Sequence, residues 1–86
     1  MERRDLSKEP LEKILFECAV LREFNGDIKT ALKELYYFIG SDEYFKFKDK
    51  YRDIDLNDGT GAEKLRREGL LFYEFCLEYG ERQKVE

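Results

Sequence analysis

The sequence predicts an all-α protein, a compact antiparallel bundle of about four helices, and three observations lead to this prediction. First, apolar residues recur at spacings of three and four in four separate stretches. Second, residues that end or cap helices, such as Asn25-Gly26 and Gly40-Ser41, separate these stretches. Third, the connections between the first three stretches are about two residues long, which favours antiparallel neighbours. With 86 residues, the chain is expected to form a single domain, 1–86.

The first helix is predicted over residues 8–24, with Ser7 as its cap and Pro10 tolerated in the opening turn. The second is predicted over residues 28–39, with Asp27 as its cap. In the first helix, the stripe expected to face the core is Leu11, Ile14, Leu15, Cys18, Leu21 and Arg22. In the second, the apolar face is Ile28, Ala31, Leu32, Leu35, Tyr36 and Ile39.

The third helix is predicted over residues 42–52, although the alternation of Phe45 and Phe47 with lysines is also typical of a strand. Its apolar stripe is Tyr44, Phe47 and Tyr51, followed by Ile54. Thr60 and Glu63 stand at capping-box spacing and predict the start of a last helix over residues 61–80. A frayed tail, 81–86, is expected after it.

The last helix is the most informative segment, because it is apolar on more than one face. Three seams run along it. The first seam is Leu65, Gly69, Phe72, Cys76 and Tyr79; the second is Leu70, Tyr73 and Leu77; the third is Leu71 and Phe75. Two interpretations stay open: either part of this surface contacts a partner, or the helix is the middle of the core and the other three helices wrap around it.

The first interpretation predicts a small intracellular protein–protein interaction module that binds another protein. It would act either as a homo-oligomer or as a binding or inhibitory subunit of a larger complex. The expected contacts are the apolar residues left over when one seam of each helix is assigned to the core: Leu70, Tyr73, Leu77, Phe16, Val20 and Phe24. Arg66 and Arg67 are expected to make contacts at the rim of this surface.

A nucleic-acid-binding regulator is the alternative function. Seven of the thirteen aromatic residues fall between Tyr36 and Tyr51, where basic residues alternate with them. Basic and aromatic side chains together are typical of surfaces that bind single-stranded nucleic acid. The residues expected to make such contacts are Lys46, Lys48, Lys50 and Arg52. Acidic neighbours weaken the positive field of this segment, so a protein partner is the favoured prediction.

No motif indicates an enzyme, a cofactor or a metal site. The chain has no His to serve as a base, and its few hydroxyl residues stand mostly where helix caps are expected. Asp53, Asp55 and Asn57 match the first ligands of an EF-hand loop, but Asp58 replaces its glycine and Lys64 its final glutamate. We therefore expect no catalytic residues, no cofactor and no bound metal.

Composition and charge predict the compartment. The N-terminus opens with charged residues, and no stretch approaches the ~20 apolar residues of a membrane span, so a cytoplasmic protein is expected. Cys18 and Cys76 are expected to be reduced and buried; a disulfide between the first and last helices is the alternative. Charged residues make up 42% of the chain and uncharged polar residues are few. This exchange is also typical of thermophilic proteins.

Overall fold

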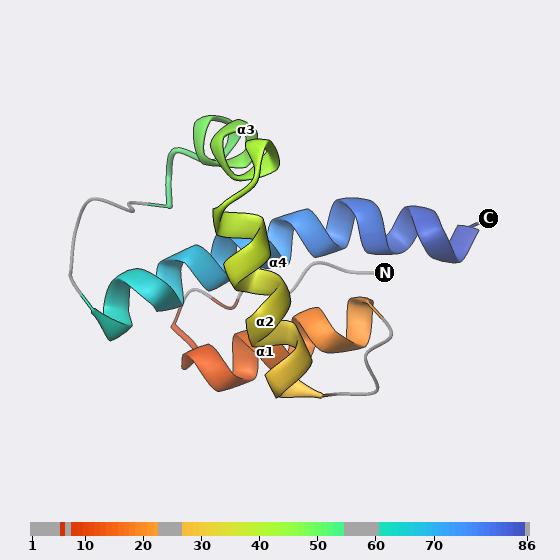
Figure 1. Cartoon of the computed structure of the whole chain (residues 1–86), viewed down its shortest axis with the longest axis horizontal. Helices are drawn as coiled ribbons and strands as arrows, with labels where there is room; N and C mark the ends of the chain where they lie inside the picture. Colours follow the sequence, from red (N-terminus) through yellow and green to blue (C-terminus); the bar gives the residue numbers. More distant parts are fainter. Residues whose placement is uncertain (1–5, 7, 23–26, 55–60, 86) are drawn as a thin grey trace.

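The computed structural model describes Leu6 and residues 8–22, 27–54 and 61–85, the last six of these for the backbone only. In this part of the chain the secondary structure consists of four helices, with no strand. They are α1 (Leu11–Leu21), α2 (Ile28–Ile39), α3 (Asp42–Lys50) and α4 (Ala62–Val85). Figure 1 shows how they pack into one body, which confirms the predicted all-α bundle.

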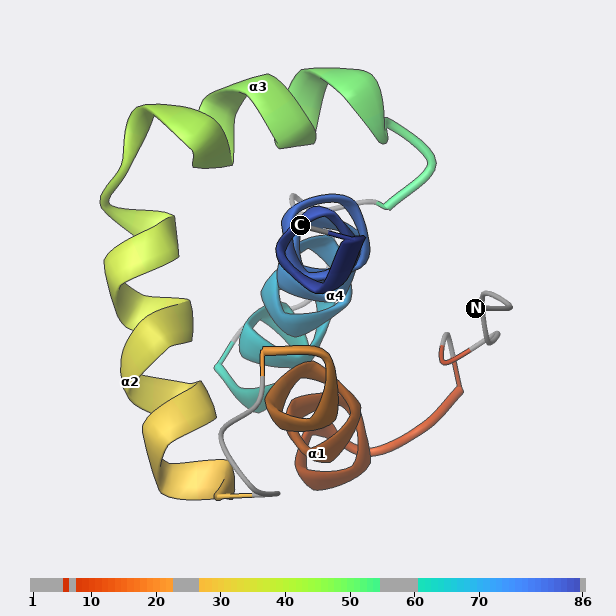
Figure 2. The same cartoon turned by 90° about the vertical axis from the view of Figure 1, so that its right-hand side faces the viewer.

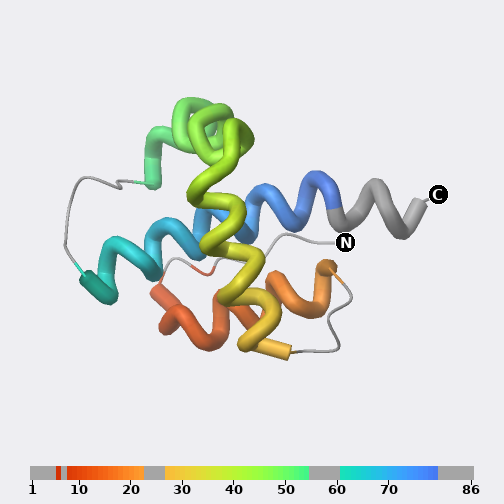
Figure 3. The backbone as a smooth tube through the Cα atoms, in the orientation of Figure 1, coloured from red at the N-terminus to blue at the C-terminus, as the bar shows by residue number. Residues whose placement is uncertain are grey.

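Helix α4 lies in the middle of this bundle. Seen along its axis in Figure 2, α4 has α1 on one side, α3 on the opposite side and α2 along a third. The largest interface is that between α1 and α4, whereas α1 and α3 do not contact each other within the described residues. Figures 1 and 3 show that α1 and α4 run in the same direction and that α2 crosses them. The pair of α1 and α4 is therefore parallel, whereas an antiparallel bundle was the expectation. The interpretation of the last helix as the middle of the core is thereby confirmed.

The helix boundaries follow the sequence signals closely at α2. It spans the predicted residues, and the Oδ1 atom of Asp27 accepts hydrogen bonds from the backbone N–H of Lys29 at 3.1 Å and of Thr30 at 3.4 Å. The Thr30 hydroxyl donates to Oδ2 of Asp27 at 2.6 Å. These hydrogen bonds, that of the Thr30 side chain above all, lower the pKa of Asp27.

The other helices differ from the prediction at their ends. Helix α1 begins at Leu11 behind Pro10, later than the predicted residue 8, because proline serves there as the last non-helical residue. The predicted caps Ser7 and Thr60 lie outside the described residues, and Ser41 makes no side-chain cap to α3. Gly61, with φ of 57°, turns the chain into α4, and α4 continues past Gly80 to Val85.

One side of the core, which we call the aliphatic interface, joins α1 to α4. The predicted stripe of α1 is confirmed, because Ile14, Leu15, Cys18 and Leu21 are all buried. Helix α1 approaches the α4 backbone closely at Gly69: a Cβ atom there would stand 2.9 Å from Cδ1 of Leu11 and 3.4 Å from Cγ2 of Ile14. The missing side chain of Gly69 is therefore what allows the two helices to come so near.

The other side of the core, which we call the aromatic cluster, joins α2 and α3 to α4. Phe38 of α2 is its centre, with ring centroids 5.8 Å from Tyr44, 6.2 Å from Phe47, 5.4 Å from Phe72 and 5.0 Å from Phe75. Further ring contacts join Phe47 and Phe75 to each other and both of them to Tyr79. The cluster consists of Phe38, Tyr44, Phe47, Phe72, Phe75 and Tyr79. It confirms that α3 is a helix whose Tyr44 and Phe47 face the core.

None of the helices, over the residues that the structure describes, has the combination of length and apolar character that a membrane crossing requires.

Candidate protein-interaction surface

Three aromatic side chains that the core leaves uncovered stand where α2 passes into α3. Tyr36 and Tyr37 lie in the last turn of α2 and are 55% and 65% exposed; Phe45 lies in the first turn of α3 and is 65% exposed. We call these three residues the corner patch. Large aromatic rings are favoured anchors in protein interfaces because they bury much area with few rotatable bonds. The corner patch is therefore the first candidate for a binding surface.

The turn between α2 and α3 holds the corner patch in place. The backbone N–H of Ser41 donates to the carbonyl oxygen of Phe38 at 3.0 Å, and the Ser41 hydroxyl donates to the same oxygen at 2.7 Å. Beneath this turn, the Phe38 ring is buried in the aromatic cluster. Because successive helical residues point about 100° apart, a buried Phe38 turns Tyr36 and Tyr37 toward solvent. The prediction that Tyr36 belongs to the apolar face of its helix is therefore wrong.

A second exposed apolar pair lies on α1. Phe16 is 41% exposed and Val20 39%, and they are four residues apart on one face of the helix. We call them the α1 strip. The Lys13 ammonium lies 5.8 Å from the centroid of the Phe16 ring. The structure thus leaves these two predicted contact residues accessible, whereas Phe24, predicted beside them, lies outside the described residues.

The contact residues predicted on α4 do not form an exposed surface. Tyr73 is only 2% exposed, so the expectation that it faces a partner is wrong. Leu70 and Leu77 are partly buried and pack against the core. The reason is the position of α4, because a helix enclosed on three sides buries more than one seam.

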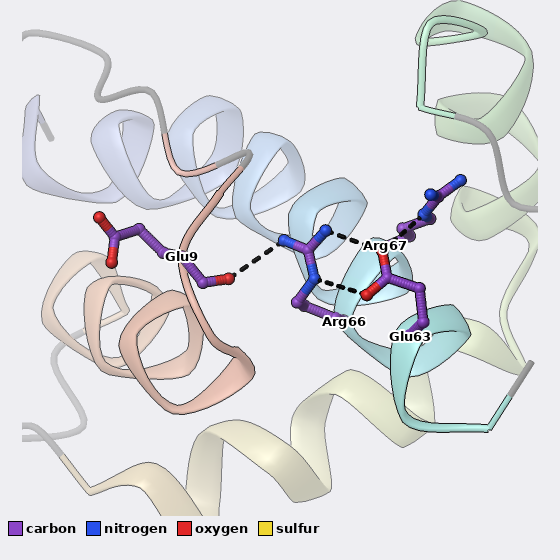
Figure 4. A network of polar contacts seen from close by, with 4 residues as sticks. All are labelled: Glu9, Glu63, Arg66 and Arg67. Atoms are coloured by element: carbon purple, nitrogen blue, oxygen red, sulfur yellow. Dashed lines mark hydrogen bonds and ion pairs between the residues drawn. The ribbon is translucent and has the colours of Figure 1, made fainter. Parts of the chain in front are cut away.

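Arg66 and Arg67 are engaged within the chain, as Figure 4 shows. The Arg66 guanidinium donates to both carboxylate oxygens of Glu63, at 3.0 and 2.8 Å, and to the backbone carbonyl of Glu9 at 3.1 Å. Arg67 Nε donates to Oε1 of Glu63 at 3.0 Å. The two arginines together lower the pKa of Glu63 to about 2, chiefly through the hydrogen bond from Arg66. This Glu63 network ties the first turn of α4 to the segment before α1.

The basic residues predicted to contact nucleic acid on α3 also have neighbours in the chain. Lys46 pairs with Glu43 at 3.5 Å, Lys50 with Glu78 at 3.3 Å, and Arg52 with Asp49. Hydrogen bonding to Glu78 raises the pKa of Lys50. The remaining member, Lys48, lies 5.9 Å from the centroid of the Tyr44 ring. A phosphate group would have to compete with carboxylates for three of these four side chains.

Glu68 is a carboxylate that the core buries. Its Oε2 atom accepts a hydrogen bond from the Tyr44 hydroxyl at 3.0 Å. Burial, and then this hydrogen bond, raises the pKa of Tyr44 to about 12. A neutral phenol that donates to a carboxylate is a structural contact between α3 and α4, because it satisfies the polar group that burial removes from water.

Metal binding has no candidate in this part of the chain: the described residues contain no group of three or more His, Cys, Asp or Glu side chains that could hold an ion. Of the segment that partly matches an EF-hand loop, the structure describes Asp53 but not Asp55, Asn57 or Asp58. Comparison with protein-family models, with curated proteins and with solved structures finds no match for this chain.

The corner patch was missed by the sequence reasoning, yet a signal for it exists. Tyr36, Tyr37 and Phe38 are consecutive, and three consecutive residues of a helix cannot all face one core. Their spacing alone leaves open which of them is buried. That choice depends on where α3 and α4 place the rings that surround Phe38.

Proposed function

We propose that this protein is a protein–protein interaction module whose main contact surface is the corner patch at the junction of α2 and α3. The supporting observation is that Tyr36, Tyr37 and Phe45 each leave more than half of their surface in water. Exposed aromatic residues lower the solubility of a protein, so an exposed cluster of them indicates a surface that binds a partner. Burying them against a partner returns that apolar area to a dry environment.

The charges around the corner patch favour a protein over a nucleic acid as the partner. From Asp27 to Ile54 the sequence carries six basic and six acidic residues, so this region has no net charge. A nucleic-acid surface needs an excess of positive charge to attract phosphates. A protein surface, in contrast, commonly meets a mixture of both signs around an apolar centre.

We propose a second copy of the chain as the occupant of this surface. A twofold axis would bring the corner patch of one copy against that of the other, so that aromatic rings meet aromatic rings. Because charges of both signs flank the patch, the two copies can pair opposite charges at the rim. The α1 strip is then a smaller, separate apolar area outside this contact.

The proposed role is binding without catalysis, in the cytoplasm. The chain lacks His, and both of its thiols are free and buried. A buried thiol is a poor nucleophile, because burial disfavours the thiolate. Free thiols also agree with a reducing compartment.

Light scattering behind size exclusion, at low and high salt, tests this function. We expect a dimer that persists at high salt, because apolar contacts are not screened by ions. The double variant Tyr37→Ala/Phe45→Ala should be a monomer with unchanged helical circular dichroism, since both side chains are exposed. The matched control Phe16→Ala/Val20→Ala, which removes the α1 strip, should remain a dimer.

Three outcomes contradict the proposal. A wild-type monomer at high concentration refutes self-association. A dimer that is lost only in the α1-strip variant moves the surface to α1. Binding to single-stranded nucleic acid that weakens steeply with salt, and is lost in Lys46→Glu/Lys48→Glu, supports the alternative function instead.

A further inference from the structure

Cys18 and Cys76 face each other across the aliphatic interface. Both side chains are completely buried, one on α1 and the other on α4. Cys18 follows Leu11 by seven residues, and Cys76 follows Gly69 by the same seven. Leu11 is the residue whose Cδ1 atom comes nearest to the Cβ position of Gly69. Because α1 and α4 run in the same direction, two turns along both helices lead from the Leu11–Gly69 approach to the Cys18–Cys76 pair.

The two thiols are close enough to share a hydrogen bond. Burial, followed by this hydrogen bond to Cys76, raises the pKa of the Cys18 thiol well above its ordinary value. The Cys18 thiol is therefore protonated and unreactive while the core is closed.

We propose that Cys18 and Cys76 are a modification site: a small-molecule disulfide converts them to an intramolecular disulfide that joins α1 to α4. This inference goes beyond the proposed function, and it is independent of the corner patch. The oxidised form would hold together the two helices that make the largest interface of the protein. The disulfide would form within one chain and not between two chains, because both sulfur atoms lie inside the same core.

The reaction is a pair of thiol–disulfide exchanges. When α1 opens from α4, one cysteine thiolate attacks a sulfur of glutathione disulfide, breaking its S–S bond and releasing one glutathione thiolate. The second cysteine thiolate then attacks the protein sulfur of this mixed disulfide and releases the second glutathione. The two protein thiols lose two electrons, glutathione disulfide gains them, and the two thiol protons end on the two glutathione molecules.

The fold should favour the cross-linked product. The disulfide would close a loop of about 60 residues, which removes much conformational freedom from the unfolded chain. The disulfide would also join two side chains that already interact in the native core. The same closed core slows the reaction, since exchange must wait for an opening of the interface.

The experiment measures the position of this equilibrium in glutathione buffers, using the full chain. Unreacted thiols are alkylated, and the fraction of each species is read by mass spectrometry, once in native buffer and once in urea. We expect the ratio of disulfide to dithiol to be about 100-fold higher in native buffer. We also expect the thermal midpoint of the oxidised protein to lie about 10 °C or more above that of the reduced protein.

Cys18→Ala and Cys76→Ala are the matched controls, and each should yield only a mixed disulfide with glutathione. The thermal comparison uses the wild-type chain alone, so it does not depend on how well these variants fold. A disulfide ratio that is equal or lower in native buffer would overturn the proposal. So would a cross-link that joins two chains, or an oxidised protein that melts below the reduced one.

Discussion

The two halves of the core use α4 in opposite ways. At the aliphatic interface, α1 comes close to the α4 backbone because Gly69 offers no side chain. In the aromatic cluster, α2 and α3 are kept at a distance by the rings of Phe38, Phe47, Phe72 and Phe75. In the aliphatic interface the helix backbones are close together, whereas in the aromatic cluster large side chains fill the space between the helices. The comparison explains how a single helix can be apolar on several faces and still belong to a small protein.

The difference also determines what each half tolerates. A closely approached backbone has little room for added atoms, so the aliphatic interface should be sensitive to residues larger than alanine. A space filled by rings leaves a cavity when one ring is removed, so the aromatic cluster should be sensitive to smaller residues. Two substitutions test this contrast, and a third tests the polar contact that joins α3 to α4.

The largest effect is expected from Phe38→Ala. Phe38 contacts four other rings, and its removal leaves a cavity that no single neighbour can fill. We expect the free energy of unfolding to fall by about 3–5 kcal/mol, measured by urea denaturation. The control Phe45→Ala removes an exposed ring and should change it by less than about 0.5 kcal/mol. Equal effects of the two would mean that the aromatic cluster does not hold α2 to α3 and α4.

A smaller effect is expected from Gly69→Val, which adds atoms where Leu11 and Ile14 already stand. Overpacking of this kind should lower the free energy of unfolding by about 1–3 kcal/mol. Gly69→Ala is the matched control. Its one methyl group meets the flexible end of Leu11, and alanine gains about 1 kcal/mol of helix propensity, so the two effects nearly cancel. If valine were tolerated as well as alanine, α1 and α4 would not be in close contact at this position.

The smallest effect is expected from Tyr44→Phe, which removes the donor to Glu68 but keeps the ring. Leaving this carboxylate without its partner should cost about 1–2 kcal/mol at neutral pH. Because the pKa of Tyr44 is raised from 10.0 to about 12, its contribution is fully present below pH 10 and is lost as the pH rises toward 12. Urea denaturation of both proteins over this range should therefore show their difference shrinking. A constant difference would contradict the Tyr44–Glu68 contact.

Much of the fold could be predicted from local signals. The limits of α2 follow from Asp27 and Gly40, and the buried stripe of α1 follows from its spacing. The direction of α1 relative to α4 could not be predicted, because short connections constrain only consecutive helices. The sequence predicts too early a start for α1, because a proline is tolerated inside the first turn of a helix as well as directly before it.

The contact residues were harder to predict than the fold. Assigning one seam of α4 to the core left Tyr73 over as a surface residue, although this helix buries several seams. The same assignment finds two exposed residues on α1, Phe16 and Val20, because α1 is enclosed on fewer sides than α4. The exposure of Tyr36 depends on Phe38 occupying the aromatic cluster, which is a property of three helices together.

The pairing of α1 with α4 has a consequence for the order in which the protein can be made. Most helical bundles fold quickly because their contacts join neighbours in sequence, but the largest interface here joins the first helix to the last. On a ribosome, α2 and α3 can begin to pair through Phe38 and Phe47 as soon as both have emerged. Helix α1 can pack against α2 early, but the face of α1 that packs against α4 remains uncovered in the nascent chain until Gly69 and the turns after it leave the exit tunnel.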